Sequence, residues 1–288
     1  MTDLTSPVPA EIDELWERRD SLTPDDGQAR EIVVAAVDLL DRGEARVFHL
    51  DPDTGSVHSD ERARRAIILC FRVLDLRPTE AGPFHHHDRL PLKSDFPGVR
   101  VVPGAIARWG SHLEPGVVLM PSFVNIGAHV GARTMVDTWA TVGSCAQIGR
   151  DVHLSGGVGI GGVLEPAGAV PVVVEDHAFV GSRAILVEGA RVRTGAKLGA
   201  GVLLTGRTRV FDSLTGDELP RGEAPAWSVC VAATYPRQHP GGEFGAPCLL
   251  VIHRLAPGKP RTHSRSRTSS GHTTPPAEHP SVRRPPCR

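Results

Sequence analysis

Three histidines have a type and spacing that could support chemistry. His129, His153 and His177 follow one another at intervals of 24 residues, and three imidazoles that converge on one point can hold a catalytic zinc ion. A histidine in a cleft could instead act as the general base for a hydroxyl acceptor, and His153 is the candidate for that role. The fold that carries these rings decides whether they meet.

The cysteine and glycine patterns argue against other kinds of site. The five cysteines are odd in number and lack Cys-x-x-Cys spacing, which predicts reduced thiols rather than a disulfide framework or a zinc knuckle. The glycine pairs at 156–157 and 161–162 resemble a phosphate loop in composition, but no Gly-x-x-x-x-Gly-Lys-Ser/Thr motif occurs. His85, His86 and His87 lie in a Pro-rich segment, where we expect at most an adventitious metal contact.

The composition limits the core and the partners. Of 288 residues, 31 are Gly, 25 are Pro and only 13 are aromatic, so the core must consist of small and branched aliphatic side chains in narrow layers. No apolar run has membrane-spanning length and no secretory segment opens the chain, which predicts a cytoplasmic protein. Residues 1–256 hold 25 basic and 32 acidic side chains. This acidic body predicts no nucleic-acid binding.

A six-residue period dominates the middle of the chain. Branched aliphatic residues recur at every sixth position in two runs, and the residue two before each is small or β-branched. The runs are Val118, Val124, Val130, Val136, Val142, Ile148, Leu154 and Ile160, then Val174, Val180, Leu186, Val192, Leu198, Leu204 and Val210. This period predicts a parallel β-solenoid in which three hexads close a triangular coil, giving about five coils.

The solenoid determines where each kind of side chain points. The aliphatic residue points into the prism and its successor points outward. We expect the glycines that often follow the aliphatics to supply the backbone freedom of tight corners. Between Ile160 and Val174 the period slips by two residues, so an insertion near 163–172 must leave the coil. A spacing of 24 residues is one and a third coils, which places the three histidines on different faces of the triangular coil. We therefore predict no metal site.

The solenoid is predicted to span 99–212, with a C-terminal strand segment over 213–256. Residues 1–98 are predicted to form a mostly helical domain followed by a loop-rich linker. Helical periodicity covers 12–16, 32–40 and 62–73. A short hairpin is predicted over 46–57. Gly43 follows the second stripe as a C-terminal cap. Residues 257–288 are basic and rich in Pro and Ser, so we expect a disordered tail. Either a frameshifted gene end or a genuine extension would account for it.

Four segments along the predicted coil carry longer motifs. They are RVVP at 100–103, LMPSFVNIGA at 119–128, MVDTWATVGSCAQIG at 135–149 and VHLSGGVGIGGVLEP at 152–166. These motifs closely resemble the tetrahydrodipicolinate N-succinyltransferases, a family of lysine and diaminopimelate synthesis, over about residues 10–255. The resemblance implies a left-handed β-helix and a homotrimer with active sites between subunits. It also implies transfer of a succinyl group from the co-substrate succinyl-CoA to the amino group of ring-opened 2-amino-6-oxopimelate. No tightly bound cofactor is implied.

The resemblance further implies which residues act. Asp137 and Glu188 match acidic residues of the family site, the second reaching the cleft from the adjacent subunit. An ammonium group is not a nucleophile, so a carboxylate must take its proton, and the sequence does not divide the roles between these two. Arg100 matches a substrate-binding arginine. Arg183 is the next candidate for a substrate carboxylate, which guanidinium binds bidentately.

Other residues of the matched motifs are weaker candidates. Asn125 and Ser144 either line the pocket or serve as corner residues, and Trp139 either walls the substrate cleft or fills the trimer interface. Glu165 lies on the insertion, which could close over the substrate as a lid. The coenzyme is expected to follow the coil-edge backbone near Gly157, Gly181 and Ala200. The alternatives are a zinc enzyme, an O-acetyltransferase that uses His153, and a non-enzymatic scaffold.

Overall fold

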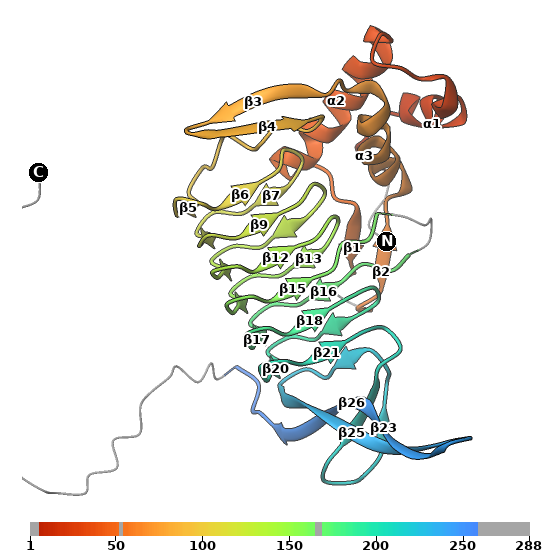
Figure 1. Cartoon of the computed structure of the whole chain (residues 1–288), viewed down its shortest axis with the longest axis vertical. Coiled ribbons are helices and arrows are strands. Elements are labelled where there is room, and N and C mark those ends of the chain that lie inside the picture. The colour runs from red at the N-terminus through yellow and green to blue at the C-terminus, as the bar shows by residue number, and fades with distance from the viewer. Residues whose placement is uncertain (1–5, 52–53, 165–168, 259–288) are drawn as a thin grey trace, which may run out of the picture.

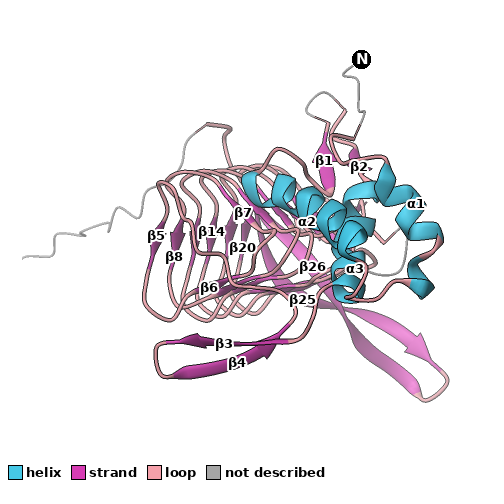
Figure 2. Cartoon of the chain, turned by 90° about the horizontal axis from the view of Figure 1, so that it is seen from above, coloured by secondary structure: helices cyan, strands magenta, loops and turns pink. Residues whose placement is uncertain are grey.

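The computed structural model describes residues 6–51, 54–164 and 169–258. A column of short strands forms the body, with helices at its upper end and a long β-hairpin at its lower end (Figure 1). Seen from above, the strands of each flank overlie one another and the helices lie toward one side of the coil (Figure 2). No helix in these ranges has the length and apolar character to span a membrane.

The N-terminal helices form where the periodicity predicts them. They are α1 (Glu11–Glu17), the 3₁₀ turn η1 (Arg19–Ser21), α2 (Gly27–Arg42) and α3 (Glu61–Val73). Asp26 and Asp60 each accept a backbone N–H of the first turn, which caps α2 and α3. Gly43 ends α2 at a φ of 77°, as expected. The apolar faces share one core, to which Ile126 and Cys145 of the coil also contribute.

Two small hairpins accompany the helices. The first pairs β1 (Phe48–Leu50) with β2 (Val57–Ser59), within the predicted hairpin region. The second pairs β3 (Arg77–Ala81) with β4 (Phe84–Asp88), where we expected only a loop-rich linker. Every side chain of β4 is exposed, as are those of β3 from Arg77 to Glu80, and Asp88 forms an ion pair with Arg108 of the coil. These residues therefore have no alternating burial that a sequence pattern could have indicated.

Three parallel sheets confirm the expected fold class, a parallel β-helix with a helical N-terminal region. Flank one contains β5 (Arg100–Val101), β8 (Val118–Leu119), β11 (Met135–Val136), β14 (His153–Leu154), β17 (Phe179–Val180) and β20 (Lys197–Leu198). Flank two contains β6 (Ile106–Ala107), β9 (Phe123–Val124), β12 (Thr141–Val142), β15 (Gly159–Ile160), β18 (Ile185–Leu186) and β21 (Leu203–Leu204). Flank three contains β7 (His112–Leu113), β10 (His129–Val130), β13 (Gln147–Ile148), β16 (Val173–Val174), β19 (Arg191–Val192) and β24 (Glu223–Ala224). We call the turns from flank one to two, two to three, and three to one the first, second and third edges.

The predicted inward positions are wrong by one residue at the start of the first aliphatic run. Val118 was expected inside, but Leu119 is the fully buried residue, and it pairs in register with Val136. From Leu119 to Val124 the chain advances five residues because this turn is one residue shorter than the others. That shift hid an additional coil, β5 to β7, so each flank has six strands in register rather than about five.

The glycines after the aliphatics serve a different purpose from the one we expected. None of Gly131, Gly143 and Gly181 has a positive φ. A Cβ at Gly143 would instead lie 2.1 Å from the nitrogen of Gly162 in the next coil. The left-handed corner position lies three residues after the aliphatic, where non-glycine residues such as Trp139 also occur. Glycine after the aliphatic therefore allows the coils to stack closely.

The lower end departs from the repeat. The chain leaves the coil after β21 to form β22 (Arg209–Asp212) and β23 (Glu218–Leu219), then returns as β24. Val210 is buried as expected, but its strand pairs with β26 (Gly242–Arg254), and Ala224 takes the place beside Val192. The hairpin of β25 (Ser228–His239) and β26 extends flank one.

The insertion between β15 and β16 turns toward the N-terminal region. Leu164 packs against the helical core, and the carbonyl oxygen of Ala169 accepts a hydrogen bond from the buried Arg64. Glu165 and the centre of the expected lid lie outside the described residues, as do 259–288 of the expected tail.

The described cysteines are free thiols, as predicted. All four are buried, and burial raises the pKa of Cys145 to about 12. At neutral pH this thiol stays protonated and therefore a poor nucleophile.

We expect Gly143→Ala to lower the free energy of unfolding by about 1–3 kcal/mol, because the added methyl group must push apart two stacked coils. Gly241→Ala is the control, since a Cβ there would meet no atom within 4 Å beyond its chain neighbours. Chemical denaturation followed by circular dichroism measures both. Equal stability of the two variants would contradict the stacking role of Gly143.

Candidate active site

Flank one aligns several predicted site residues. Its outward column contains, in register, Arg100, Val118, Met135, His153, Phe179 and Lys197. Asp137 follows the inward Val136 at the first edge, as the period predicted. Arg100 and Asp137 therefore belong to the same flank, with only β8 between their strands. This flank brings a cation and a carboxylate into one region.

One carboxylate oxygen of Asp137 accepts a backbone hydrogen bond, and the other is available to a ligand. Its Oδ1 accepts the backbone N–H of Thr138 at 2.7 Å, and its Oδ2 lies 3.7 Å from Nε2 of His153. The carboxylate is one-third exposed. The ring of His153 stacks on Phe179 with centroids 5.3 Å apart. Such a carboxylate can accept a proton or bind a cationic group.

The first edge also carries Trp139 and Arg183. Both have a left-handed backbone, and the indole is 74% exposed. Gly157 lies between them along the edge, since its N–H donates to the Thr138 carbonyl and the Arg183 N–H donates to the Gly156 carbonyl. A Cβ at Gly157 would lie 3.0 Å from Nε of Arg183, so glycine lets this side chain lie across the edge.

Arg183 is exposed and has no carboxylate partner among the described residues. A guanidinium without an internal partner can bind a ligand carboxylate bidentately. Gly181 and Ala200 meet further along the same edge, where a Cβ on Gly181 would lie 2.6 Å from the Ala200 nitrogen. The three positions proposed for the coenzyme thus share one edge.

The second edge holds the remaining predicted residues, Asn125, Ser144 and Glu188. Glu188 is exposed, and its carboxylate has no partner within the described ranges. Oδ1 of Asn125 accepts the Ile126 N–H at 2.9 Å and Nη1 of Arg108 at 3.2 Å, so its oxygen already has a role in the fold. Asp137 and Glu188 therefore lie at opposite borders of flank two in a single chain.

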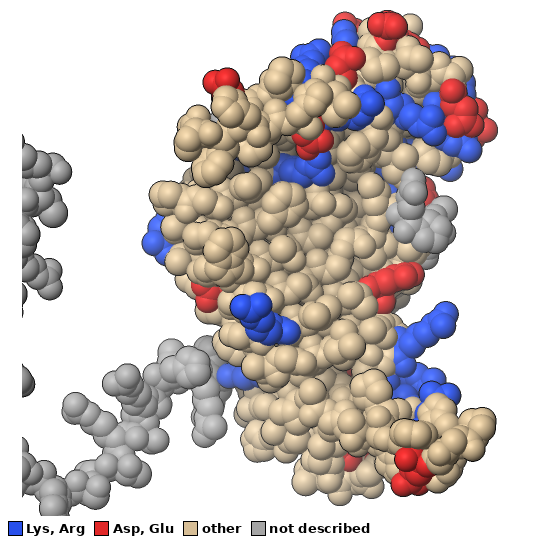
Figure 3. All heavy atoms as spheres, in the orientation of Figure 1, with Lys and Arg blue, Asp and Glu red and all other residues tan. Residues whose placement is uncertain are grey.

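The outward face of flank two is uncharged. Its column, in register, is Ile106, Phe123, Thr141, Gly159, Ile185 and Leu203. Ile185 and Leu203 are each about half exposed. The middle of this face is almost free of charged side chains in the space-filling view (Figure 3). An apolar stripe bounded by two polar edges is typical of a protein contact surface.

The three histidines lie on separate parts of the coil. His129 belongs to flank three and His153 to flank one, while His177 follows β16 at the third edge. Within the described residues, no group of three potential ligands is arranged to hold a metal ion.

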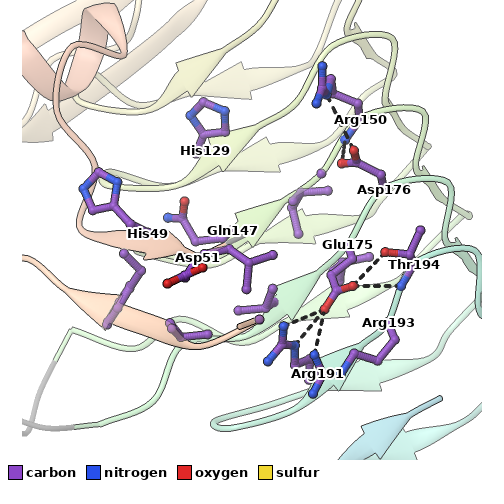
Figure 4. A pocket seen from close by; sticks show the side chains of 18 of the residues that line it. His49, Asp51, His129, Gln147, Arg150, Glu175, Asp176, Arg191, Arg193 and Thr194 are labelled. Atoms are coloured by element: carbon purple, nitrogen blue, oxygen red, sulfur yellow. Dashed lines mark hydrogen bonds and ion pairs between the residues drawn. The ribbon is translucent and has the colours of Figure 1, made fainter. Parts of the chain in front are cut away.

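A cavity of about 490 Å³ lies between the β1–β2 hairpin and flank three. His129, Gln147, Glu175 and several arginines face it (Figure 4). Its four arginines pair with carboxylates, as Arg46–Glu114, Arg150–Asp176, Arg191–Glu175 and Arg193–Glu223. Burial lowers the pKa of His129 to about 2, which keeps the ring neutral.

No predicted site residue lines this cavity. Its charges are balanced within the chain, unlike those of Arg183 and Glu188. Sequence reasoning missed the cavity because packing of a distant hairpin on the coil creates it, and no local motif records that contact.

The hexapeptide coil, together with two family models, defines the class, a hexapeptide-repeat acyltransferase. Residues 171–206 match the model described as the hexapeptide repeat of succinyl-transferase, and residues 8–73 match the N-terminal model of tetrahydrodipicolinate N-succinyltransferase.

Curated relatives cover most of the chain. The 2,3,4,5-tetrahydropyridine-2,6-dicarboxylate N-succinyltransferase of Paramagnetospirillum magneticum is 46% identical over 85% of this chain and 91% of its own length. The enzyme of the same name from Afipia carboxidovorans is 44% identical over 88% and 93%, and that of Cereibacter sphaeroides is 42% identical over 92% and 96%. The chain belongs to the tetrahydrodipicolinate N-succinyltransferase family.

We expect Arg183→Asn to raise the KM of an anionic substrate at least about tenfold, because a charged hydrogen bond is lost while Asn tolerates the left-handed backbone. Arg133→Asn is the matched control, since Arg133 is also exposed, has a φ of 61° and lies at the third edge. Steady-state kinetics for each substrate measures the change. Equal KM values for the two variants would remove Arg183 from the site.

Proposed function

We propose that this chain transfers the succinyl group of succinyl-CoA to the amino group of ring-opened tetrahydrodipicolinate, in lysine synthesis through diaminopimelate. The amine nitrogen attacks the thioester carbon, the C–S bond breaks, and the coenzyme leaves as a thiol after taking up a proton. The product is N-succinyl-2-amino-6-oxopimelate. The family membership and the cations and carboxylates at the two edges support this reaction.

The active site is a cleft between two copies of the chain. One observation carries this proposal: an uncharged flank two lies between the edge of Asp137 and the edge of Glu188. Burying that apolar face against other copies releases water from it. Around a threefold axis, the first edge of one copy then faces the second edge of the next. A homotrimer would thereby unite the two acids, which a single chain keeps on opposite borders.

The acids prepare the nucleophile. The substrate amine is protonated at neutral pH, and Oδ2 of Asp137 is placed to hold it and to accept its proton. Glu188 from the neighbouring copy adds a second carboxylate, which can assist hydration of the imine or the same deprotonation. Trp139, largely exposed in one chain, would be covered when the edges meet, and it walls the cleft.

The arginines bind the anionic ends of the substrates. Arg100 and Arg183 have no carboxylate partners among the described residues, so each guanidinium is available. The pantetheine arm extends along the first edge, past Gly157, Gly181 and Ala200. The N–H groups of Gly157 and Gly181 already donate to the carbonyl oxygens of Thr138 and Leu198, so the exposed backbone at Ala200 is the candidate on this edge to stabilise the oxyanion of the tetrahedral intermediate.

Release of thiol from succinyl-CoA in the presence of 2-aminopimelate, a stable mimic of the acceptor, tests the reaction. Acetyl-CoA with sugar or serine acceptors tests the O-acetyltransferase alternative in the same assay. Thiol release only with the second set would overturn the proposed function.

We expect Asp137→Asn and Glu188→Gln each to lower kcat by at least about 10², the usual size of lost acid–base assistance. Both changes retain side-chain size, so circular dichroism and the molar mass in solution should be unchanged. Asp151→Asn is a control at the third edge. Full activity of either site variant would remove that acid from the mechanism.

Mixing the two inactive variants should restore activity if the cleft is shared. After subunit exchange, about a quarter of the interfaces in random trimers combine an intact Asp137 with an intact Glu188 from the neighbour. Recovery of that fraction of the wild-type rate is expected. If both acids act within one chain, no mixed trimer contains a complete site and the rate stays at the level of the variants.

A further inference from the structure

We infer that His153 is a positioning residue that controls, by its protonation, whether the Asp137 carboxylate is available to the substrate amine. The inference rests on the proposed function of Asp137 and adds a residue that this function does not require.

The geometry around His153 supports an electrostatic rather than a fixed contact. Its Nε2 lies 3.7 Å from Oδ2 of Asp137, which is beyond hydrogen-bond distance but within the range of an ion pair. The other oxygen of Asp137 is already held by the Thr138 N–H. The imidazole thus faces the one carboxylate oxygen that remains for the substrate.

Packing fixes the ring in this place. His153 stacks on Phe179 of the strand below, at an interplanar angle of 27°, and Met135 precedes it in the outward column. Asp137 is the acidic group that faces it, and Lys197 is the next charged residue in the column, beyond Phe179. His153 is two-fifths exposed, so protons can reach it from solvent.

The two protonation states have opposite effects on Asp137. An imidazolium at this distance attracts the carboxylate, lowers its affinity for a proton and repels the substrate ammonium. A neutral imidazole does none of these, and the carboxylate is then free for the amine. Protonation of this ring as the pH falls would therefore lower the activity.

The experiment compares the pH dependence of kcat/KM for wild type and His153→Gln, using succinyl-CoA and 2-aminopimelate. Gln can still donate a hydrogen bond but does not titrate. Between pH 7.5 and 5.5 we expect a loss of about tenfold for wild type and less than about twofold for the variant. His153→Asn provides a second test if His153→Gln fails to fold, and circular dichroism monitors both.

His177→Gln is the matched control. Nδ1 of His177 lies 3.8 Å from Oδ2 of Asp151 at the third edge, and its ring stacks near Trp227. It is thus a second histidine–aspartate pair away from the proposed site, in which Arg133 also holds the carboxylate. The His177→Gln variant should show the same loss of kcat/KM between pH 7.5 and 5.5 as the wild type. The inference is overturned if His153→Gln shows that loss too, or if it lowers kcat/KM equally at every pH. It is also overturned if His177→Gln abolishes the loss.

These outcomes are separable from failure of the proposed function. A wild-type protein that does not transfer succinyl to 2-aminopimelate would overturn the function itself. An active wild type whose Asp137→Asn variant is inactive, with an unchanged His153→Gln profile, would overturn only the role of His153.

Discussion

Stacking of the coils is the constraint on which the rest of the structure depends. Each inward aliphatic residue is almost fully buried in one continuous core, and burial of such a side chain is worth about 1.5–3 kcal/mol. Parallel backbone pairing then places equivalent residues of successive coils above one another. Side chains far apart in the sequence therefore form columns, and every proposed site residue takes its place from its column and its edge.

The columns also separate two kinds of charge. On flank three, arginines and carboxylates such as Arg191 and Glu175 pair with each other beside a cavity that the N-terminal hairpin helps to form. On the first and second edges, Arg183 and Glu188 have no such partners among the described residues. Internally paired charges hold the fold together, whereas unpaired ones at the borders of an apolar face are available to substrates and to another copy of the chain.

Much of the fold could be predicted because the period is local and physical. An aliphatic residue at every sixth position can be buried in only one way, so the coil and the outward direction of Asp137 followed from it, and Gly43 indicated the end of α2. The shortened turn after Leu119 could not be predicted, because two adjacent branched residues, Val118 and Leu119, each suit an inward position. The need for glycine at Gly143 could not be predicted either, because the atoms that would clash with a Cβ there belong to the next coil.

The sequence by itself determined the class of fold, the family and the identity of the candidate acids and arginines, because these follow from short-range periodicity and from motifs along the chain. Only the tertiary structure decided that Asp137 and Glu188 lie at opposite borders of an uncharged flank, and that His153 faces Asp137 while His129 lies beside a separate cavity. The physical reason is that both relations join residues through the stacking and closure of coils, which no segment of the chain encodes alone.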